Sequence, residues 1–250
     1  MSPKSKSDCL IIAAGKGSRL VAHGEPKPLV RLGGSTLIER VMCTAAEAGV
    51  RGFCIVTGHL AESIERFVPA SPRLAGFDVE FVRNPDFDRE NGLSVARAAG
   101  RTGERFVLLM SDHLFEARIL SRLLAEPIAG DEVILAVDTR IHDHPTVDLD
   151  DVTKVRVEGG AIRDIGKGLT DYNAFDTGIF LCTPALFAAL GESAARGDFS
   201  LSGGIRALAA RGKARVFDVG DGLWIDVDDT PAYERAERLF APRLCAASPR

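Results

Sequence analysis

Apolar runs of strand length alternate with segments of helical period along the first 140 residues of the chain. The runs are almost entirely apolar, which is typical of strands buried on both faces of a sheet. We expect these strands at 9–13, 53–57, 79–82, 105–110 and 133–137. Between them, apolar residues recur every three or four positions, which predicts helices at 35–49, 61–68, 92–99 and 117–126. Ser35 is expected to cap the first helix and Gly49 to end it.

The pattern changes after about residue 140. Two short segments, 152–157 and 161–165, flank Gly159-Gly160, which predicts a β-hairpin. Beyond it we expect strands at 175–182 and 214–219 and helices at 184–196, 201–211 and 230–240, the last capped by Thr230. The β-α-β-α order predicts an α/β fold, a Rossmann-like mixed, mostly parallel sheet with helices on both faces and a β-hairpin insertion.

Composition narrows the class of protein. The 250 residues are 46% hydrophobic and 26% charged, which suits one globular domain over 1–250 with flexible ends at 1–7 and 242–250. A formal net charge of −4 argues against nucleic acid or an anionic membrane as the main partner. Five cysteines without CxxC spacing suit reduced thiols. No run approaches about 18 apolar residues and no signal peptide is evident, so we expect a cytoplasmic protein without membrane insertion.

A glycine-rich turn with basic residues follows the first strand. Residues 13–20 read AAGKGSRL, and 26–29 read PKPL. Backbone N–H groups in such a turn can approach a polyphosphate closely, and the nearby cations would neutralise it. A Walker A loop would need glycine at Leu10, and a Rossmann fingerprint would need glycine at Leu20, so both are excluded. The alternative is a glycine-rich surface turn whose basic residues are solvated.

Two aspartates are candidates for a metal site. Asp112 follows the apolar run 105–110, at the sheet edge where the glycine turn is also expected, and Asp226 ends the segment Trp224-Ile225-Asp226. Magnesium prefers hard oxygen ligands, typically one or two carboxylates with phosphate oxygens. Asp228 is a further candidate, and His113 is expected to support the site rather than act as a base. Asp112, taken singly, is equally well explained as a turn residue or helix cap, and Asp228 and Asp229 are alternative caps of the helix predicted at 230–240.

Polar residues elsewhere suit the remaining parts of two substrates. Asn91, Gly92 and Ser94 open a predicted helix and offer an amide, a free N–H and a hydroxyl, as a base or ribose needs; a plain helix N-terminus is the alternative. Lys154 and Lys167 are placed to neutralise an acceptor phosphate, and the alternative for each is a solvated strand residue. The predicted hairpin would lie on this acceptor side.

The segment 10–20, with Lys27-Pro28-Leu29, resembles the signature of the sugar-1-phosphate nucleotidyltransferase superfamily. The resemblance implies a GT-A-like nucleotidyltransferase fold, a loop wrapped around a nucleoside triphosphate, and Mg²⁺ held by Asp112 and Asp226. It implies catalytic roles for Arg19, Lys27, Asp112 and Lys167. The implied nucleotide contacts are Ala13, Ala14, Gly15, Lys16, Gly17, Ser18, Arg19, Lys27, Gly58, Asn91, Gly92, Ser94 and Ser111. The implied acceptor contacts are Lys154, Lys167, Asp176, Thr177 and Gly178.

A narrower resemblance covers roughly residues 8 to 240. Ser111-Asp112-His113, Ile165-Gly166-Lys167, Asp176-Thr177-Gly178 and the segment 224–228 are together similar to CTP:inositol-1-phosphate cytidylyltransferases. This implies transfer of a cytidylyl group from CTP to inositol 1-phosphate, giving CDP-inositol and pyrophosphate, by a transferase without an attached lipid-synthase domain.

Several points stay open at the level of sequence. UTP in place of CTP is an alternative, as are phosphocholine, 2-aminoethylphosphonate or a sugar 1-phosphate as acceptor. The superfamily's sugar enzymes usually carry Glu-Lys-Pro and Asn-x-Gly where this chain has Ile165-Gly166-Lys167 and Asp176-Thr177-Gly178, which disfavours a hexose 1-phosphate. A homodimer is a further candidate assembly. An inactive regulatory binding module is the alternative of another class, and the retained cations and acids argue against it.

Overall fold

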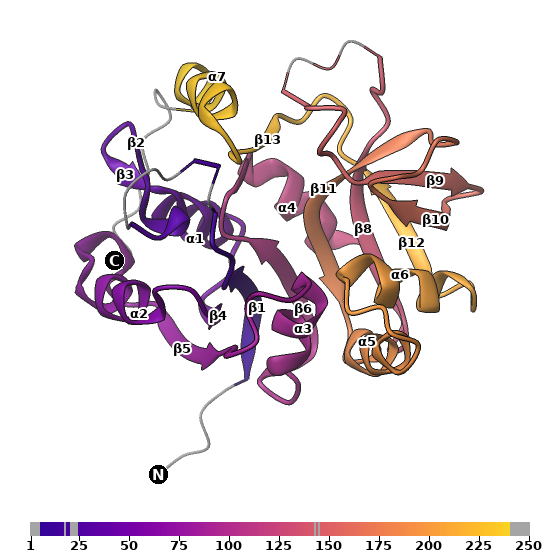
Figure 1. Ribbon diagram of the computed structural model, residues 1–250, viewed down its shortest axis with the longest axis horizontal. Helices are drawn as coiled ribbons and strands as arrows, with labels where there is room; N and C mark the ends of the chain where they lie inside the picture. The colour runs from indigo at the N-terminus through magenta and orange to yellow at the C-terminus, as the bar shows by residue number, and fades with distance from the viewer. Residues whose placement is uncertain (1–5, 18, 21–24, 143, 145, 241–250) are drawn as a thin grey trace.

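The computed structural model describes residues 6–17, 19–20, 25–142, 144 and 146–240. Nine strands form one mixed sheet in the order β5-β4-β1-β6-β11-β8-β12-β10-β9 (Figure 1). Their bounds are β1 Ser7–Ala13, β4 Gly52–Thr57, β5 Asp78–Arg83, β6 Thr102–Met110, β8 Val133–Asp138, β9 Lys154–Glu158, β10 Ala161–Gly166, β11 Ala174–Cys182 and β12 Ala214–Asp218. The predicted mixed α/β fold is confirmed, but the sheet is not mostly parallel, because the described pairings β6–β11, β11–β8, β12–β10, β10–β9 and β11–β9 are antiparallel.

Parallel pairing is concentrated in the amino-terminal half of the sheet. There β5, β4, β1 and β6 are all parallel neighbours, joined by crossover helices. β11 enters antiparallel between β6 and β8, and β8 pairs in parallel with β12. The predicted hairpin is formed by β9 and β10, which pair antiparallel across Gly159-Gly160. The carboxyl ends of β1 and β6 therefore meet at one edge, beside the hairpin half of the sheet.

Helices cover both faces, as the all-apolar strands predict. Alternate residues of β1 face opposite ways: Ile11 belongs to one hydrophobic cluster, with α1, α2, α4 and α7, and Leu10 to another, with α3, α5 and α6. The helices are α1 Leu37–Glu47, α2 Ala61–Ala70, α3 Asn91–Arg97, α4 Ala117–Ala125, α5 Ala185–Ala195, α6 Leu201–Ala209 and α7 Thr230–Phe240. None of the helices in the described part of the chain has the length and apolar run needed to cross a bilayer.

The predicted cap of the first helix is wrong by one residue. Thr36, not Ser35, is the N-cap: its Oγ1 accepts from Glu39 N at 3.3 Å, and Glu39 Oε2 accepts from Thr36 N at 2.8 Å. This reciprocal pair is a capping box. Ser35 instead pairs with Leu32, because 31–32 and 35–36 form the small antiparallel ribbon β2–β3 (Arg31–Leu32 and Ser35–Thr36).

The last helix is also capped by a neighbour of the predicted residue. Asp229 Oδ1 accepts from Ala232 N at 2.7 Å, so Asp229 rather than Thr230 satisfies the first turn of α7. At the other end of the chain, Ser7 is the first residue of β1, where its N–H donates to Arg101 O at 3.1 Å. The rest of the predicted flexible ends, 1–5 and 242–250, lies outside the described residues.

A second small sheet escaped the sequence pattern. β7 (His113–Phe115) pairs antiparallel with β13 (Trp224–Asp226), so that His113 lies opposite Asp226. Val227 N also donates to Asp112 O at 3.1 Å. Each strand has three residues, too short for a periodic signal. This pairing brings two acids that are far apart in the sequence to the same place.

Candidate active site

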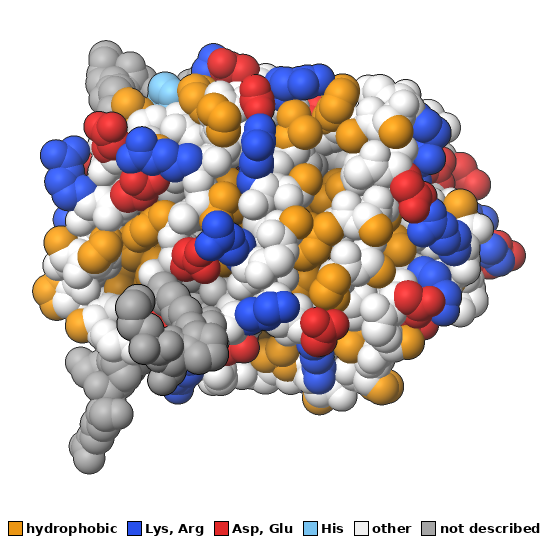
Figure 2. Space-filling model, turned by 90° about the horizontal axis from the view of Figure 1, so that it is seen from below, with side chains coloured by type: hydrophobic (Ala, Val, Ile, Leu, Met, Phe, Trp, Pro, Cys, Tyr) orange, Lys and Arg blue, Asp and Glu red, His pale blue; other side chains and the backbone are white. Residues whose placement is uncertain are grey.

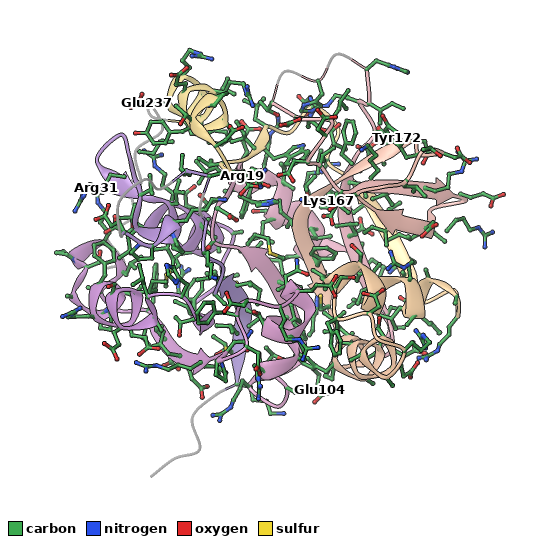
Figure 3. All side chains as sticks on the ribbon, viewed as in Figure 1. Arg19, Arg31, Glu104, Lys167, Tyr172 and Glu237 are labelled. Carbon is green, nitrogen blue, oxygen red and sulfur yellow. The ribbon has the colours of Figure 1, made fainter. Side chains whose placement is uncertain are left out.

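A pocket of about 460 Å³ opens at the carboxyl ends of β1 and β6, between the two halves of the sheet. Arg19 and Lys167 approach the same region from the two halves (Figure 3). Fourteen of the residues that the sequence singled out line this pocket. They are Ala13, Gly15, Gly17, Arg19, Lys27, Asn91, Ser94, Ser111, Asp112, Lys167, Asp176, Gly178, Asp226 and Asp228.

The glycine turn closes over the side chain of Lys27. Gly17 has φ of +58°, and a Cβ atom there would lie 2.4 Å from Lys27 Cβ, so the turn needs glycine. Lys27 begins the short 3₁₀ turn η1 (Lys27–Leu29) and is 4% exposed. The Pro-Lys-Pro segment and the glycine turn therefore act together to bury a cation at the bottom of the pocket.

Three carboxylates surround the Lys27 ammonium group. Nζ lies 2.5 Å from Asp112 Oδ2 and 3.8 Å from Asp226 Oδ1, and it also contacts Asp228 Oδ1. Burial by itself would lower the pKa of Lys27, but the surrounding carboxylates raise it well above its usual value. Burial would raise the pKa of Asp112, and the charges of Lys27 and His113 lower it instead. The group is thus a buried charge network with Lys27 at its centre.

His113 is held as a cation behind this network. Its Nε2 lies 3.2 Å from Asp226 Oδ2, and its Nδ1 donates a hydrogen bond to Thr177 O at 2.8 Å. Burial alone would lower the pKa of His113, but the Asp226 carboxylate overrides this and raises it to about 10. Gly178 leaves room for the ring, because a Cβ there would lie 2.2 Å from Nδ1. A protonated imidazole cannot accept a proton, which agrees with the supporting role expected for His113.

Asp151 was missed by the sequence reasoning. Its Oδ2 accepts from Arg19 Nη2 at 2.8 Å, and its Oδ1 pairs with Lys167 Nζ at 2.5 Å. Arg19 Nη2 also donates to Asp228 Oδ2 at 2.8 Å. The acidic run 148–151 before the hairpin was the available signal. One carboxylate therefore links the cation of the glycine turn to the cation of the hairpin.

The acids fit a divalent cation. Carboxylate oxygens of Asp151, Asp226 and Asp228 lie within 4.8 Å of one another. Asp112 and Asp226 belong to a second such group, whose third member, His113, is already paired with Asp226 and Thr177. Among the described residues, Asp226 Oδ1 is a buried oxygen without a hydrogen-bond partner. Carboxylate oxygens are the donors that Mg²⁺ prefers. Asp112, Asp226 and Asp228, which the sequence singled out as candidates for a metal site, therefore lie together in an arrangement that would suit a divalent cation.

Several expected nucleotide contacts are engaged within the fold itself. Ser94 Oγ accepts from Asn84 Nδ2 at 2.9 Å, and Asn91 Oδ1 accepts from Leu201 N at 2.9 Å. The backbone of Gly92 packs against residues 199–200, where a Cβ would lie 2.5 Å from Phe199 O. The contacts of Asn91 and Gly92 join the start of α3 to the start of α6, and Ser94 joins α3 to the residue that follows β5.

The other nucleotide candidates divide between the turn and the surface. Ala14 O accepts from His59 N at 3.0 Å, and Gly58 packs on Ala14. Lys16 pairs with Asp88 at the surface, where its side chain is 55% exposed. The residues that line the pocket do not include Ala14, Lys16, Gly58 or Gly92. Ser18 lies outside the described residues.

The acceptor candidates also divide into two groups. Lys167, Asp176 and Gly178 line the pocket. Lys154 does not, because its Nζ donates to Leu149 O at 2.8 Å and to Lys167 O at 3.1 Å. Thr177 is fully buried and donates to Ala136 O at 2.7 Å. Burial raises the pKa of Asp176 to about 6.

This combination defines a class of protein: an α/β domain that handles phosphorylated ligands at the carboxyl edge of its sheet, with cations and carboxylates side by side. The family profile of the MobA-like NTP transferase domain matches residues 9–157, and the chain belongs to this family. It is a nucleotidyltransferase of the α/β type that the sequence predicted.

Relatives are similar over most of the chain. The bifunctional IPC transferase and DIPP synthase of Rubrobacter xylanophilus is 38% identical over 232 residues, 92% of this chain and 51% of that protein. The CMP-5'-(3-aminopropyl)phosphonate synthase of Streptomyces rubellomurinus is 32% identical, over 93% of this chain and 38% of that protein. The chain thus spans about half or less of the length of these relatives.

Solved structures agree on the fold. The inositol-1-phosphate CTP transferase from T. maritima has a TM-score of 0.78 and 27% identity, covering 92% of this chain and 94% of its own. A UDP-glucose pyrophosphorylase complexed with UDP-glucose has the same TM-score at 20% identity, covering 96% of this chain and 100% of its own. The second likeness concerns the fold alone.

Proposed function

We propose that this chain transfers a cytidylyl group from CTP to inositol 1-phosphate, giving CDP-inositol and pyrophosphate. The observation that carries the proposal is the cluster of Asp112, Asp226 and Lys27 beside the glycine turn, with Lys167 facing it across the pocket. The likeness to an inositol-1-phosphate CTP transferase over 92% of the chain supports this choice of substrates.

The acceptor supplies its own nucleophile. A phosphate monoester has a second pKa near ~6, so one of its oxygens is ionised at neutral pH and needs no general base. That oxygen attacks the α-phosphorus of CTP, the bond to the β-phosphate bridging oxygen breaks, and pyrophosphate leaves with the electron pair. This agrees with His113, which is already protonated and paired with Asp226.

The protein's task is then to bring two anions together and to stabilise the leaving group. The backbone of the glycine turn and Arg19 hold the triphosphate, Lys27 lies at the reacting end, and Lys167 holds the acceptor phosphate. Asp176 accepts hydrogen bonds from acceptor hydroxyls. Asp112 and Asp226 would hold Mg²⁺, which would act as a Lewis acid and neutralise charge on phosphate oxygens. Arg19 and Lys167 both pair with Asp151 in the structure. Each of these cations therefore exchanges a carboxylate for a phosphate when its substrate binds.

A pyrophosphate-release assay tests the proposal. Each of four nucleoside triphosphates is paired with inositol 1-phosphate, glucose 1-phosphate, phosphocholine or 2-aminoethylphosphonate, with Mg²⁺ and with a chelator as control. We expect the fastest release with CTP and inositol 1-phosphate. Release that needs no acceptor, or none with any of the pairs, would contradict a cytidylyl transfer.

An aminoalkylphosphonate is a second candidate acceptor. The similarity to the CMP-5'-(3-aminopropyl)phosphonate synthase favours it, and so do the acids Asp148, Asp151 and Asp176 on the pocket wall, which could pair with an ammonium group. The ratio of kcat/KM for inositol 1-phosphate and for 3-aminopropylphosphonate decides between the two acceptors. The metal and nucleotide assignments are the same for both.

A further inference from the structure

A fully buried carboxylate lies behind the pocket, at the carboxyl end of β8. Asp138 is 0% exposed and accepts hydrogen bonds from three side chains. Trp224 Nε1 and His144 Nε2 each donate at 2.8 Å, and Arg140 donates through Nη2 at 2.6 Å and through Nε at 2.9 Å. Burial would raise the pKa of Asp138, but these donors hold it well below its usual range. The carboxylate is therefore a permanently charged acceptor.

The donors come from two segments that form the pocket. Trp224 is the first residue of β13, the strand that ends in Asp226. His144 lies in the connection between β8 and β9, the same connection that carries Thr146 and Asp151 to the pocket wall. Asp138 is thus the common partner of the strand that holds a metal ligand and of the connection that faces the acceptor.

Further hydrogen bonds tie these two segments to each other. Thr146 Oγ1 donates to Trp224 O at 2.9 Å, and Thr146 N donates to His144 Nδ1 at 3.3 Å. Because Nδ1 accepts a backbone N–H, the ring proton is on Nε2 and points at Asp138. Arg140 Nη2 also donates to Gly222 O at 2.8 Å, two residues before Trp224. The bonds of Thr146 Oγ1 and Arg140 restrict where β13 can lie relative to the β8–β9 connection, and the bond of Thr146 N fixes the His144 ring within that connection.

We propose that Asp138 is a positioning residue for the metal site: through Trp224 it sets the place of Asp226, and through His144 it sets the acceptor wall against it. The proposal rests on the proposed function only in its assignment of Asp226 as a metal ligand. When a group that orients a metal ligand is removed, the affinity for the metal commonly falls.

The test measures the binding of Mn²⁺ alone by calorimetry, on full-length chains freed of metal by a chelator. Asp138→Asn keeps the shape but turns an acceptor oxygen into an amide that faces donors. We expect it to weaken Mn²⁺ binding about 10-fold or more. Trp224→Phe removes the Nε1–H donor together with part of the ring and leaves Asp138 with Arg140 and His144, so we expect a smaller loss in the same direction.

Thr183→Val is the matched control. Thr183 is 1% exposed, and its Oγ1 donates to Glu132 O at 2.9 Å. This bond lies at the end of the β8–β11 strand pair opposite to Asp138. We expect it to lower the unfolding midpoint while keeping the parental Mn²⁺ affinity. Trp224 is the only tryptophan of the sequence, so its emission reports directly on the loss of its contact with Asp138 in the Asn variant.

Two outcomes would overturn the proposal. In the first, folded Asp138→Asn and Trp224→Phe proteins bind Mn²⁺ as tightly as the parent, which leaves Asp138 a purely structural role. In the second, the parent itself binds no Mn²⁺, which leaves no ligand to position. Because no substrate is present, the result does not depend on whether CTP and inositol 1-phosphate react.

Discussion

Lys27 is the residue on which the charge balance of the pocket depends. It is the buried cation among Asp112, Asp226 and Asp228, and the carboxylates would repel one another without it. The contact with Lys27 lowers the pKa of Asp228 to about 2, against the opposing effect of burial. The charged groups of the pocket are therefore already in place before any phosphate binds. Electrostatic catalysis requires such preorganisation.

Removal of one member of this network tests its role in the reaction. We expect Asp112→Ala to lower the rate of pyrophosphate release by roughly 10²–10³ with the fold intact, because one metal ligand and one partner of Lys27 are lost. Asp171→Ala, whose side chain is 79% exposed at the surface, serves as the control and should keep the parental rate. Equal turnover by folded Asp112→Ala protein would remove Asp112 from the site.

Asp176 predicts a pH dependence of stability. Its pKa is raised to about 6 by burial, above the value of about 3.9 in an unfolded chain, so the folded state binds the proton more tightly. Stability from this proton is fully present below about pH 4 and is lost as pH rises through 6. We expect the parent to lose roughly 2–3 kcal/mol relative to Asp176→Asn between pH 4 and 7. Urea unfolding at several pH values measures it, and parallel curves for both proteins would contradict it.

At the scale of elements, short strands decide where the functional groups lie. The register of β7 against β13 places His113 opposite Asp226, and the glycine turn after β1 encloses Lys27. A shift of either strand by one residue would turn its side chains to the other face. The long strands and helices form the two cores, whereas these three-residue strands place the charges.

The capping box of α1 gives a test at this scale. We expect Thr36→Ala to lower the free energy of unfolding by about 1 kcal/mol, because Glu39 N loses its acceptor. Ser35→Ala is the matched control, since Ser35 Oγ is buried without a hydrogen-bond partner among the described residues, and its loss should cost little. Chemical denaturation measures both variants. A larger loss of unfolding free energy for Ser35→Ala than for Thr36→Ala would indicate that Ser35 caps the helix, as the sequence pattern predicts.

At the scale of the whole molecule, the pocket lies between two halves of one sheet. β1 and β6 supply the glycine turn and Asp112 from one side, and the segment from β9 to β11 supplies Lys167, Asp176 and Gly178 from the other. On the face drawn in Figure 2, basic and acidic side chains are interspersed among apolar ones, so positive and negative charge are mixed across it. The charge that matters for the ligands is gathered inside the pocket.

Metal binding should therefore stabilise the whole fold. The proposed ligands Asp112 and Asp226 meet only in the folded chain, so Mg²⁺ held by them would bind the native state in preference to the unfolded one. We expect saturating Mg²⁺, at about 100 times its Kd, to add roughly 2.7 kcal/mol to the free energy of unfolding. The double variant Asp112→Asn, Asp226→Asn should lose this gain, as thermal unfolding with and without Mg²⁺ would show. An equal gain in parent and variant would place the ion elsewhere.

The sequence by itself determined the fold class, the strands and helices, and the principal chemical groups. Strand burial, helical period and the glycine-rich turn are local patterns, and each segment carries its own signal of secondary structure. Asp112 was found because an acid that follows an apolar strand must lie at the edge of the sheet. The sequence pattern missed the short strands β2, β3, β7 and β13, and it misplaced caps at element ends, as at Ser35 and Thr230, where a neighbouring side chain reaches the free N–H groups better.

Tertiary structure alone decided which side chains share the pocket. The sequence offered both Lys154 and Lys167 as cations for an acceptor phosphate, yet backbone carbonyls hold Lys154 while Lys167 reaches Asp151. Asp138 ends an ordinary apolar strand, and its partners arrive from 140–146 and from 224. The direction of a side chain depends on the register and twist of strands that are distant in sequence. No local pattern encodes that, because the contacts exist only once the whole sheet has formed.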